Sequence, residues 1–123
     1  MICLDTNYLI LGLVPGSRES RELSAWFTSG ETLVTPMLAW FEFLCGPVTA
    51  VQIQTMRAFL HALLPFDESH AIAAAGLFNA AGRKRTVRVD AMIAATAIVA
   101  GAALATNSQH DFSAFKERGL RLA

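Results

Sequence analysis

The sequence is poor in charged residues, and the two signs balance. Only 16% of the residues are charged, ten basic and ten acidic, so the formal net charge is zero. A chain without a basic excess has no overall electrostatic attraction for nucleic acid, which excludes proteins that bind it through bulk charge. Any attraction for RNA or DNA must therefore come from a local cluster of cations.

Cysteine is also rare, and long apolar runs are missing. Cys3 and Cys45 are the only cysteines, and both lie in apolar stretches, which is typical of buried, reduced thiols. We therefore expect no disulfide and a cytoplasmic protein. The most apolar stretch, residues 91–105, is shorter than the roughly 18–20 residues that span a bilayer, so no membrane association is expected.

Motifs of several common active sites are absent. His61, His70 and His110 show no HxxxH spacing and the cysteines no CxxC spacing, which argues against a zinc site. No glycine-rich phosphate loop and no nucleophile elbow occurs either. Aspartate and glutamate remain as the candidates for chemistry.

What the sequence does contain is an alternation of short apolar runs and helical patterns. The apolar runs predict strands at 1–4, 32–35, 104–106 and 120–122. Periodicity and capping residues predict helices at 8–14, 17–29, 36–46, 49–64, 68–82 and 91–100. Such an alternation predicts one α/β domain, residues 1–123, in which helices flank a mostly parallel central sheet.

Acidic residues stand where a sheet of this kind forms its binding sites. Asp5 ends the first predicted strand, Asn107 follows the third, and Asp90 opens the buried helix before it. Because such sites lie outside the carboxyl ends of the strands, we expect these residues to meet in one crevice. Helix capping is the structural alternative for Asp5 and Asp90, and it is the only interpretation for Asp67.

Glu42 is the most informative of the acidic residues, because the apolar stretch around it holds no other charge. The nearest charged residues in sequence are Glu31 and Arg57, so no ion pair one helical turn away is available. A carboxylate among apolar side chains is costly unless it is paired or binds a metal. The alternative is a partly exposed glutamate on an amphipathic helix. Clustered carboxylates suit Mg²⁺, which prefers oxygen ligands and substrate phosphates.

The order of these segments resembles the PIN-domain ribonucleases. Residues 2–7, Ile-Cys-Leu-Asp-Thr-Asn, look like the opening strand and Asp-Thr-Asn motif of that family. Residues 35–46, 90–97 and 105–112 are similar to its second, third and closing segments. The resemblance spans almost the whole chain and is closest to VapC-type toxins of toxin–antitoxin pairs. It implies a PIN-like three-layer sandwich, a homodimer, and a cognate antitoxin that lies across the active site.

The resemblance also implies roles for individual residues. Asp5, Glu42 and Asp90 would be the catalytic, metal-coordinating acids of an endoribonuclease that uses Mg²⁺, with Mn²⁺ as a substitute. A metal-activated water would attack the RNA phosphodiester. Thr6 would orient Asp5.

The closing segment departs from the family pattern. Asn107 occupies the place where many members carry a fourth aspartate, which leaves the number of bound metals open. Asp111 would supply the missing charge at longer range. A basic run before Asp90 is expected to hold the RNA backbone, with ordinary solvated surface charge as the alternative, and single-stranded RNA fits a cleft best. This run comprises Arg83, Lys84, Arg85 and Arg88.

Two other interpretations stay open. A catalytically silent PIN-like module that binds RNA or protein is compatible with Asn107. A receiver-like signalling domain is also α/β and binds magnesium. It would need paired acids after the first strand, whereas Asp5 stands alone there.

Overall fold

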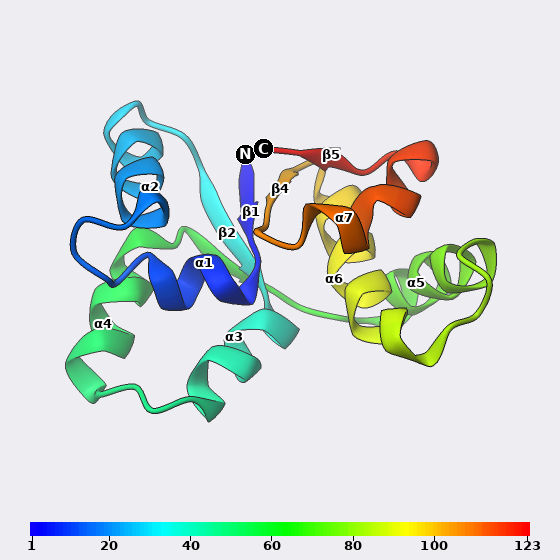
Figure 1. The fold of residues 1–123 in the computed structure, drawn as a ribbon, viewed down its shortest axis with the longest axis horizontal. Helices are drawn as coiled ribbons and strands as arrows, with labels where there is room; N and C mark the ends of the chain where they lie inside the picture. Colours follow the sequence, from blue (N-terminus) through cyan, green and yellow to red (C-terminus); the bar gives the residue numbers. More distant parts are fainter.

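The computed structural model describes residues 1–123 and contains one five-stranded parallel sheet (Figure 1). The strands are β1 (Ile2–Leu4), β2 (Leu33–Pro36), β3 (Ala62–Leu64), β4 (Ala103–Ala105) and β5 (Arg121–Leu122). Their order is β3-β2-β1-β4-β5, and all four neighbouring pairs are parallel. The central strand β1 is the point where the strand order reverses, which is where α/β sheets place their sites.

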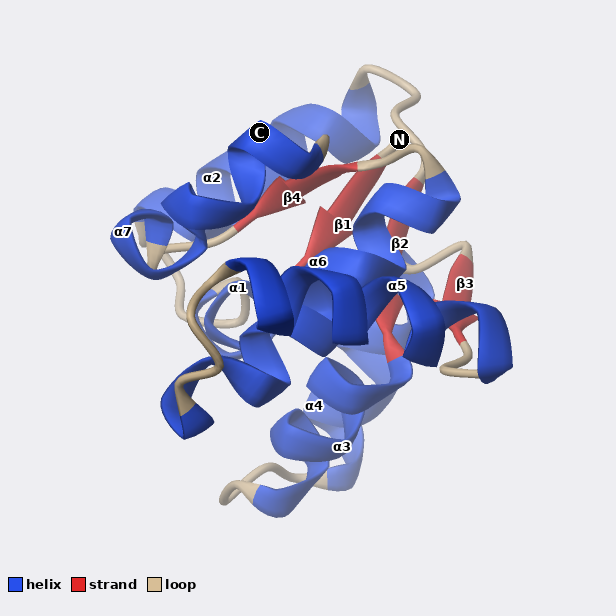
Figure 2. Cartoon of the chain, turned by 90° about the vertical axis from the view of Figure 1, so that its right-hand side faces the viewer, coloured by secondary structure: helices blue, strands red, loops and turns tan.

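Helices cover both faces of this sheet and complete a PIN-like three-layer α/β sandwich, as expected. They are α1 (Thr6–Leu11), α2 (Arg18–Thr28), α3 (Met37–Cys45), α4 (Ala50–Phe59), α5 (Glu68–Ala80), α6 (Arg88–Ala100) and α7 (Gln109–Phe112). Two 3₁₀ helices, η1 (Arg85–Val87) and η2 (Ser113–Arg118), complete the chain. Figure 1 shows α1, α2 and α4 on one side of the strands and α5 and α6 on the other. Figure 2 shows the strands from the side of α5.

The sheet separates two apolar cores, because successive strand residues point to opposite faces. Cys3 and Leu104 belong to the core with α5 and α6, whereas Leu4 and Ala105 belong to the core with α1 to α4. All four side chains are fully or almost fully buried. Residues that directly follow β1 and β4 are therefore held at a rigid edge of the sheet.

The structure corrects the predicted helix at 49–64. Helix α4 ends at Phe59, and residues 62–64 form the edge strand β3 beside β2. The amide of His61 already donates to the carbonyl of Leu33 at 2.7 Å. An apolar run such as Leu63-Leu64 fits a helix and a buried strand equally well, and pairing with β2 decides between them.

Several predicted helix starts also shift. Pro36 ends β2 instead of opening α3, and the hydroxyl of Thr35 donates to the carbonyl of Leu4 instead of capping a helix. Helix α6 begins at Arg88, so Asp90 lies in its first turn and is not its cap. Asp67 caps α5 as predicted.

The two cysteines differ in their surroundings. Both are free, but Cys45 is exposed at the end of α3, whereas the sequence analysis expected both to be buried. Burial raises the pKa of the Cys3 thiol. None of the helices combines the length and the apolar character needed to cross a membrane.

Candidate active site

A pocket of about 300 Å³ lies beside the carboxyl ends of the central strands. It brings together Asp5, Glu42 and Asp90, the three acids that the sequence analysis singled out. Asp5 follows β1, Glu42 belongs to α3, and Asp90 to α6. The other lining residues are Thr6, Asn7, Ile10, Val89, Ile93 and Ser108.

Asp5 is the most firmly held of the three acids. Its side chain is only 6% exposed, and it caps helix α1. The amide of Thr6 donates to Oδ1 at 2.8 Å, and the hydroxyl of Thr106 donates to Oδ2 at 2.7 Å. Burial raises the pKa of Asp5, while the hydrogen bonds from Thr106 and Thr6 act in the opposite direction. Asp5 thus caps α1 and also lines the pocket.

Glu42 reaches the pocket from the solvent side. Helix α3 buries Ala39, Trp40 and Phe43, which leaves Glu42 exposed on the other face. The idea that apolar neighbours enclose this carboxylate is therefore wrong. The neighbours in sequence point away from it around the helix. The hydroxyl of Thr6 donates to Oε1 of Glu42 at 3.2 Å.

Thr6 contacts both Asp5 and Glu42, whereas Thr106 contacts Asp5. Thr6 was predicted to orient Asp5, and its backbone amide does contact that residue. The Thr6 hydroxyl instead contacts Glu42, and the hydroxyl on Asp5 comes from Thr106. No role for Thr106 was predicted from the sequence. The available signal was its position directly after a strand that neighbours β1.

Asp90 carries the clearest electrostatic effect of the pocket. It is half-buried in the first turn of α6. Burial raises the pKa of Asp90 to about 6, and the negative charges of Asp5, Asp111 and Glu42 add to the shift. Asp111, an exposed residue of α7, does not line the pocket, but its charge acts on Asp90. The acids therefore share one electrostatic environment.

Asn107 does not line the pocket of Asp5, Glu42 and Asp90. Arg18 Nη2 donates to Asn107 Oδ1 at 2.5 Å, and Asn107 Nδ2 donates to Oε1 of Glu19 at 3.0 Å. Glu19 is only 8% exposed, and its pKa is lowered by hydrogen bonds from its own amide, Asn107 and Arg18. Ser108, not Asn107, lines the pocket. No sequence signal pointed to this contact between α2 and the loop after β4.

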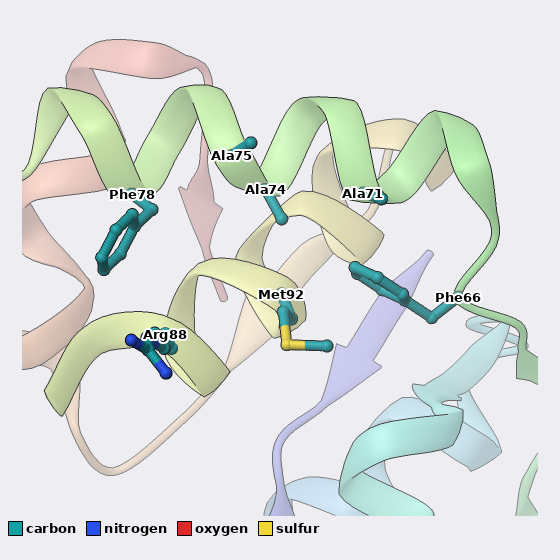
Figure 3. Close-up of a pocket in the computed structure, with 7 residues that line it drawn as sticks. All are labelled: Phe66, Ala71, Ala74, Ala75, Phe78, Arg88 and Met92. Carbon is teal, nitrogen blue, oxygen red and sulfur yellow. The ribbon is translucent and has the colours of Figure 1, made fainter. Parts of the chain in front are cut away.

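The basic run lies at the start of α6, and its members face different ways. Arg83, Lys84 and Arg85 are exposed, and Arg83 Nη1 donates to Oδ1 of Asn79 at 3.1 Å. Arg88 lies on the side of α6 that faces α5, with its guanidinium carbon 6.0 Å from the centre of the Phe78 ring (Figure 3). Arg88 is therefore near Asp90 in sequence but does not line the acidic pocket.

The donor set of the pocket matches a hard cation in chemistry but does not form a closed cage. No three carboxylate, imidazole or thiol groups of the chain lie close enough together to enclose a metal ion. Mg²⁺ usually keeps several waters and uses only one or two protein carboxylates directly. An open pocket whose charged groups are all carboxylates fits such a partly hydrated ion better than it fits Zn²⁺.

Comparisons with known proteins agree with this arrangement. The family model of the PIN domain matches residues 2–117. A toxin–antitoxin complex from Klebsiella pneumoniae is similar with 26% identity and a TM-score of 0.71, over 92% of this chain and 91% of that one. FitAcB from Neisseria gonorrhoeae is similar with 23% identity and a TM-score of 0.74, over 99% and 96%.

VapBC2 from Rickettsia felis, bound to a DNA fragment from its promoter, has 20% identity and a TM-score of 0.74, over 100% and 98%. The two structures with less than 25% identity show the fold alone. A comparison with curated proteins finds no match.

Proposed function

Because this chain belongs to the PIN domain family, we propose that it is a magnesium-dependent endoribonuclease and the toxin of a toxin–antitoxin pair. The pocket shared by Asp5, Glu42 and Asp90 carries the proposal. The charges of Asp5 and Glu42 both raise the pKa of Asp90, as expected for acids that converge on one site. The similarity to a toxin–antitoxin complex supports the toxin role.

The residues of the pocket would each have a defined role. Asp5, Glu42 and Asp90 would hold Mg²⁺ or Mn²⁺, and the ion would lower the pKa of water and offset charge on the phosphate. Thr106 and the Thr6 amide hold Asp5 in one orientation, which limits its freedom before substrate binds. With a pKa of about 6, Asp90 is mostly ionised and ready to bind a cation at neutral pH.

Partners follow from the apolar surface. As the sequence suggests, we expect the protein to form a homodimer, to bind a cognate antitoxin and to lie in the cytoplasm. Trp40 and Phe43 are buried and add no apolar surface to α3. Phe41 is 64% exposed, and Met37 and Leu44 on the same helix are also exposed. An exposed apolar helix face of this kind is typical of an interface.

A cleavage assay tests the proposal. Purified protein is incubated with total RNA in Mg²⁺ or EDTA, and Asp5→Asn and Asp90→Asn are compared with the wild type. Cleavage should require the metal and fall at least about 100-fold in both variants. Glu68→Gln, which removes an exposed carboxylate at the start of α5, serves as the matched control and should cleave normally. Equal cleavage by all proteins, or cleavage in EDTA, contradicts the proposal.

A catalytically silent PIN-like binding module is the second candidate. It is favoured by Asn107, which bonds Arg18 and Glu19 and supplies no fourth acid to the pocket. Under that function the wild type leaves RNA intact with Mg²⁺ and with Mn²⁺, yet still retains it in a binding assay. The match to the PIN domain family removes the receiver-like alternative.

A further inference from the structure

A second hollow lies between α5 and α6, outside the acidic pocket. It has a volume of about 270 Å³ and is almost entirely apolar (Figure 3). Phe66, Phe78 and Met92 line it together with three alanines of α5, and Arg88 is its only charged residue. We call this hollow the α5–α6 groove. The aromatic rings and the lone guanidinium make it a surface for a flat, apolar group that is attached to negative charge.

The first turn of α6 connects the groove to the acidic pocket. Arg88 and Met92 line the groove, whereas Val89, Asp90 and Ile93 line the pocket. At 100° per residue, Arg88 lies about 200° from Asp90 around the helix, so the two hollows flank opposite sides of one turn. An α-helix with its side chains is only about 10–12 Å wide. A short extended segment of a ligand is therefore sufficient to reach from one hollow to the other.

The chain between Ser69 and Val89 is positively charged, and Asp67, Glu68 and Asp90 border this stretch. From Ser69 to Val89 the chain has no aspartate or glutamate, and it has four cations. All four are exposed, and three of them, Arg83, Lys84 and Arg85, lie between α5 and α6. A second copy that places the same groove against this one is a poor occupant, because the groove offers Arg88 no acid as a partner. An anionic occupant is favoured instead.

We propose that the α5–α6 groove holds an unpaired base of the single-stranded RNA whose backbone enters the acidic pocket. Unpaired bases stack on aromatic side chains and on guanidinium planes, and Phe78 with Arg88 offers both. The exposed cations of the basic run contact the neighbouring phosphates. The inference rests on the proposed ribonuclease function for the identity of the ligand. Binding in the groove is nevertheless measurable without cleavage.

The test compares two probes of equal length and charge, with and without bases. One is a labelled unstructured RNA oligonucleotide, and the other is its abasic counterpart. Both are titrated in EDTA, so that binding is measured without cleavage. We expect the wild type to bind the oligonucleotide about tenfold more tightly than the abasic chain. Phe78→Leu, which keeps an apolar side chain but removes the aromatic face, should lose most of this preference. Arg88→Gln should weaken the binding of both probes.

Matched variants and melting curves separate a local effect from unfolding. Phe27→Leu removes an exposed aromatic ring that packs on Phe59, on the other side of the sheet, and should keep the preference for bases. Lys116→Gln removes an exposed cation that does not line the groove and should leave the affinities of both probes within about twofold of the wild type. Melting temperatures of all variants identify any that fail to fold, and Phe66→Leu then replaces Phe78→Leu.

The outcomes distinguish this inference from the proposed function. Equal binding of both probes by the wild type, or an unchanged preference in both phenylalanine variants, overturns the base site even if RNA is cleaved. Displacement of RNA and abasic chain alike by an acidic peptide, with no preference for bases, indicates a protein-docking surface and also overturns it. A clear base preference in a protein that cleaves no RNA supports the groove and contradicts only the ribonuclease function.

Discussion

The hydroxyl of Thr106 donates a hydrogen bond of 2.7 Å to Oδ2 of Asp5, although 101 residues separate them in the chain. The contact exists because β1 and β4 are parallel neighbours in which Leu4 pairs with Ala105. Asp5, which follows β1, is therefore placed beside Thr106, which follows β4. With the Thr6 amide on Oδ1, both oxygens of Asp5 are held.

Removing the Thr106 hydroxyl should impair the pocket without removing an acid. In Thr106→Val, Asp5 keeps its charge but loses the bond to Oδ2, and we expect cleavage or metal affinity to fall about 10- to 100-fold. Thr106→Ser restores a hydroxyl and should recover most of the loss. Thr96→Val is the control, because Thr96 is equally buried but bonds only the carbonyl of Met92. Initial cleavage rates and Mg²⁺ titrations measure the effect, and an active Thr106→Val protein would remove Thr106 from the site.

The stability of the metal-free protein should depend on Asp90. Its pKa is about 6 in the folded protein and 3.8 as the ordinary value. Between these values the folded state binds a proton that the unfolded state does not, so the free energy of unfolding decreases as the pH rises. Above about pH 6 Asp90 is ionised in both the folded and the unfolded state, so its destabilising effect on the fold is complete. Melting temperatures in EDTA from about pH 4 to pH 7 should therefore fall more steeply for the wild type than for Asp90→Asn. Parallel curves would show that Asp90 is ionised normally.

Glu42→Gln should separate metal binding from folding. Glu42 is exposed, and its only side-chain hydrogen bond comes from Thr6, which a glutamine oxygen also accepts. We expect the metal-free variant to be as stable as the wild type or more stable, because one charge that acts on Asp90 is removed. Mg²⁺ should stabilise the wild type more than the variant. Thermal melts in EDTA and in Mg²⁺ measure both effects. A lower melting temperature in EDTA together with an equal response to Mg²⁺ would assign Glu42 a structural role.

Placing an aspartate at position 107 should not improve the site. The Asn107 amide donates to Glu19, so Asn107→Asp replaces a hydrogen bond with two adjacent carboxylates, partly offset by Arg18. We expect a loss on the order of 1 kcal/mol and a melting temperature lower by several degrees. The response to Mg²⁺ should stay unchanged, because this side chain does not line the pocket. A stronger response would show that the loop after β4 turns the residue toward the acids.

Asp111 is the fourth acid that the electrostatics favour. Its charge raises the pKa of Asp90, so Asp111→Asn should lower that pKa and weaken Mg²⁺ binding. Carboxyl-carbon NMR shifts of Asp90, followed against pH in metal-free protein, report the pKa directly. Glu117→Gln, an exposed acid in η2 that does not act on Asp90, should leave the titration unchanged. Coincident curves for Asp111→Asn and the wild type would argue against this role.

The local sequence pattern predicted those elements that depend on contacts between residues close together in the chain. Asp67 was predicted to be a cap from its position, since a cap bonds amides only two or three residues away. The failures concern residues whose conformation depends on distant partners. Strand β3 exists only because β2 lies beside it. Likewise, Glu42 is exposed because Trp40 and Phe43 occupy the buried face of α3.

The sequence by itself determined the α/β alternation and which acids occur at the ends of strands and helices, because short-range periodicity and capping depend on near neighbours. Only the tertiary structure decided how these acids are held. Strand register placed Thr106 on Asp5, and the packing of α2 drew Asn107 toward Glu19. The turn of α6 separated Arg88 from Asp90. These contacts join residues from separate elements, and their geometry arises only when the sheet has paired and the helices have packed against it.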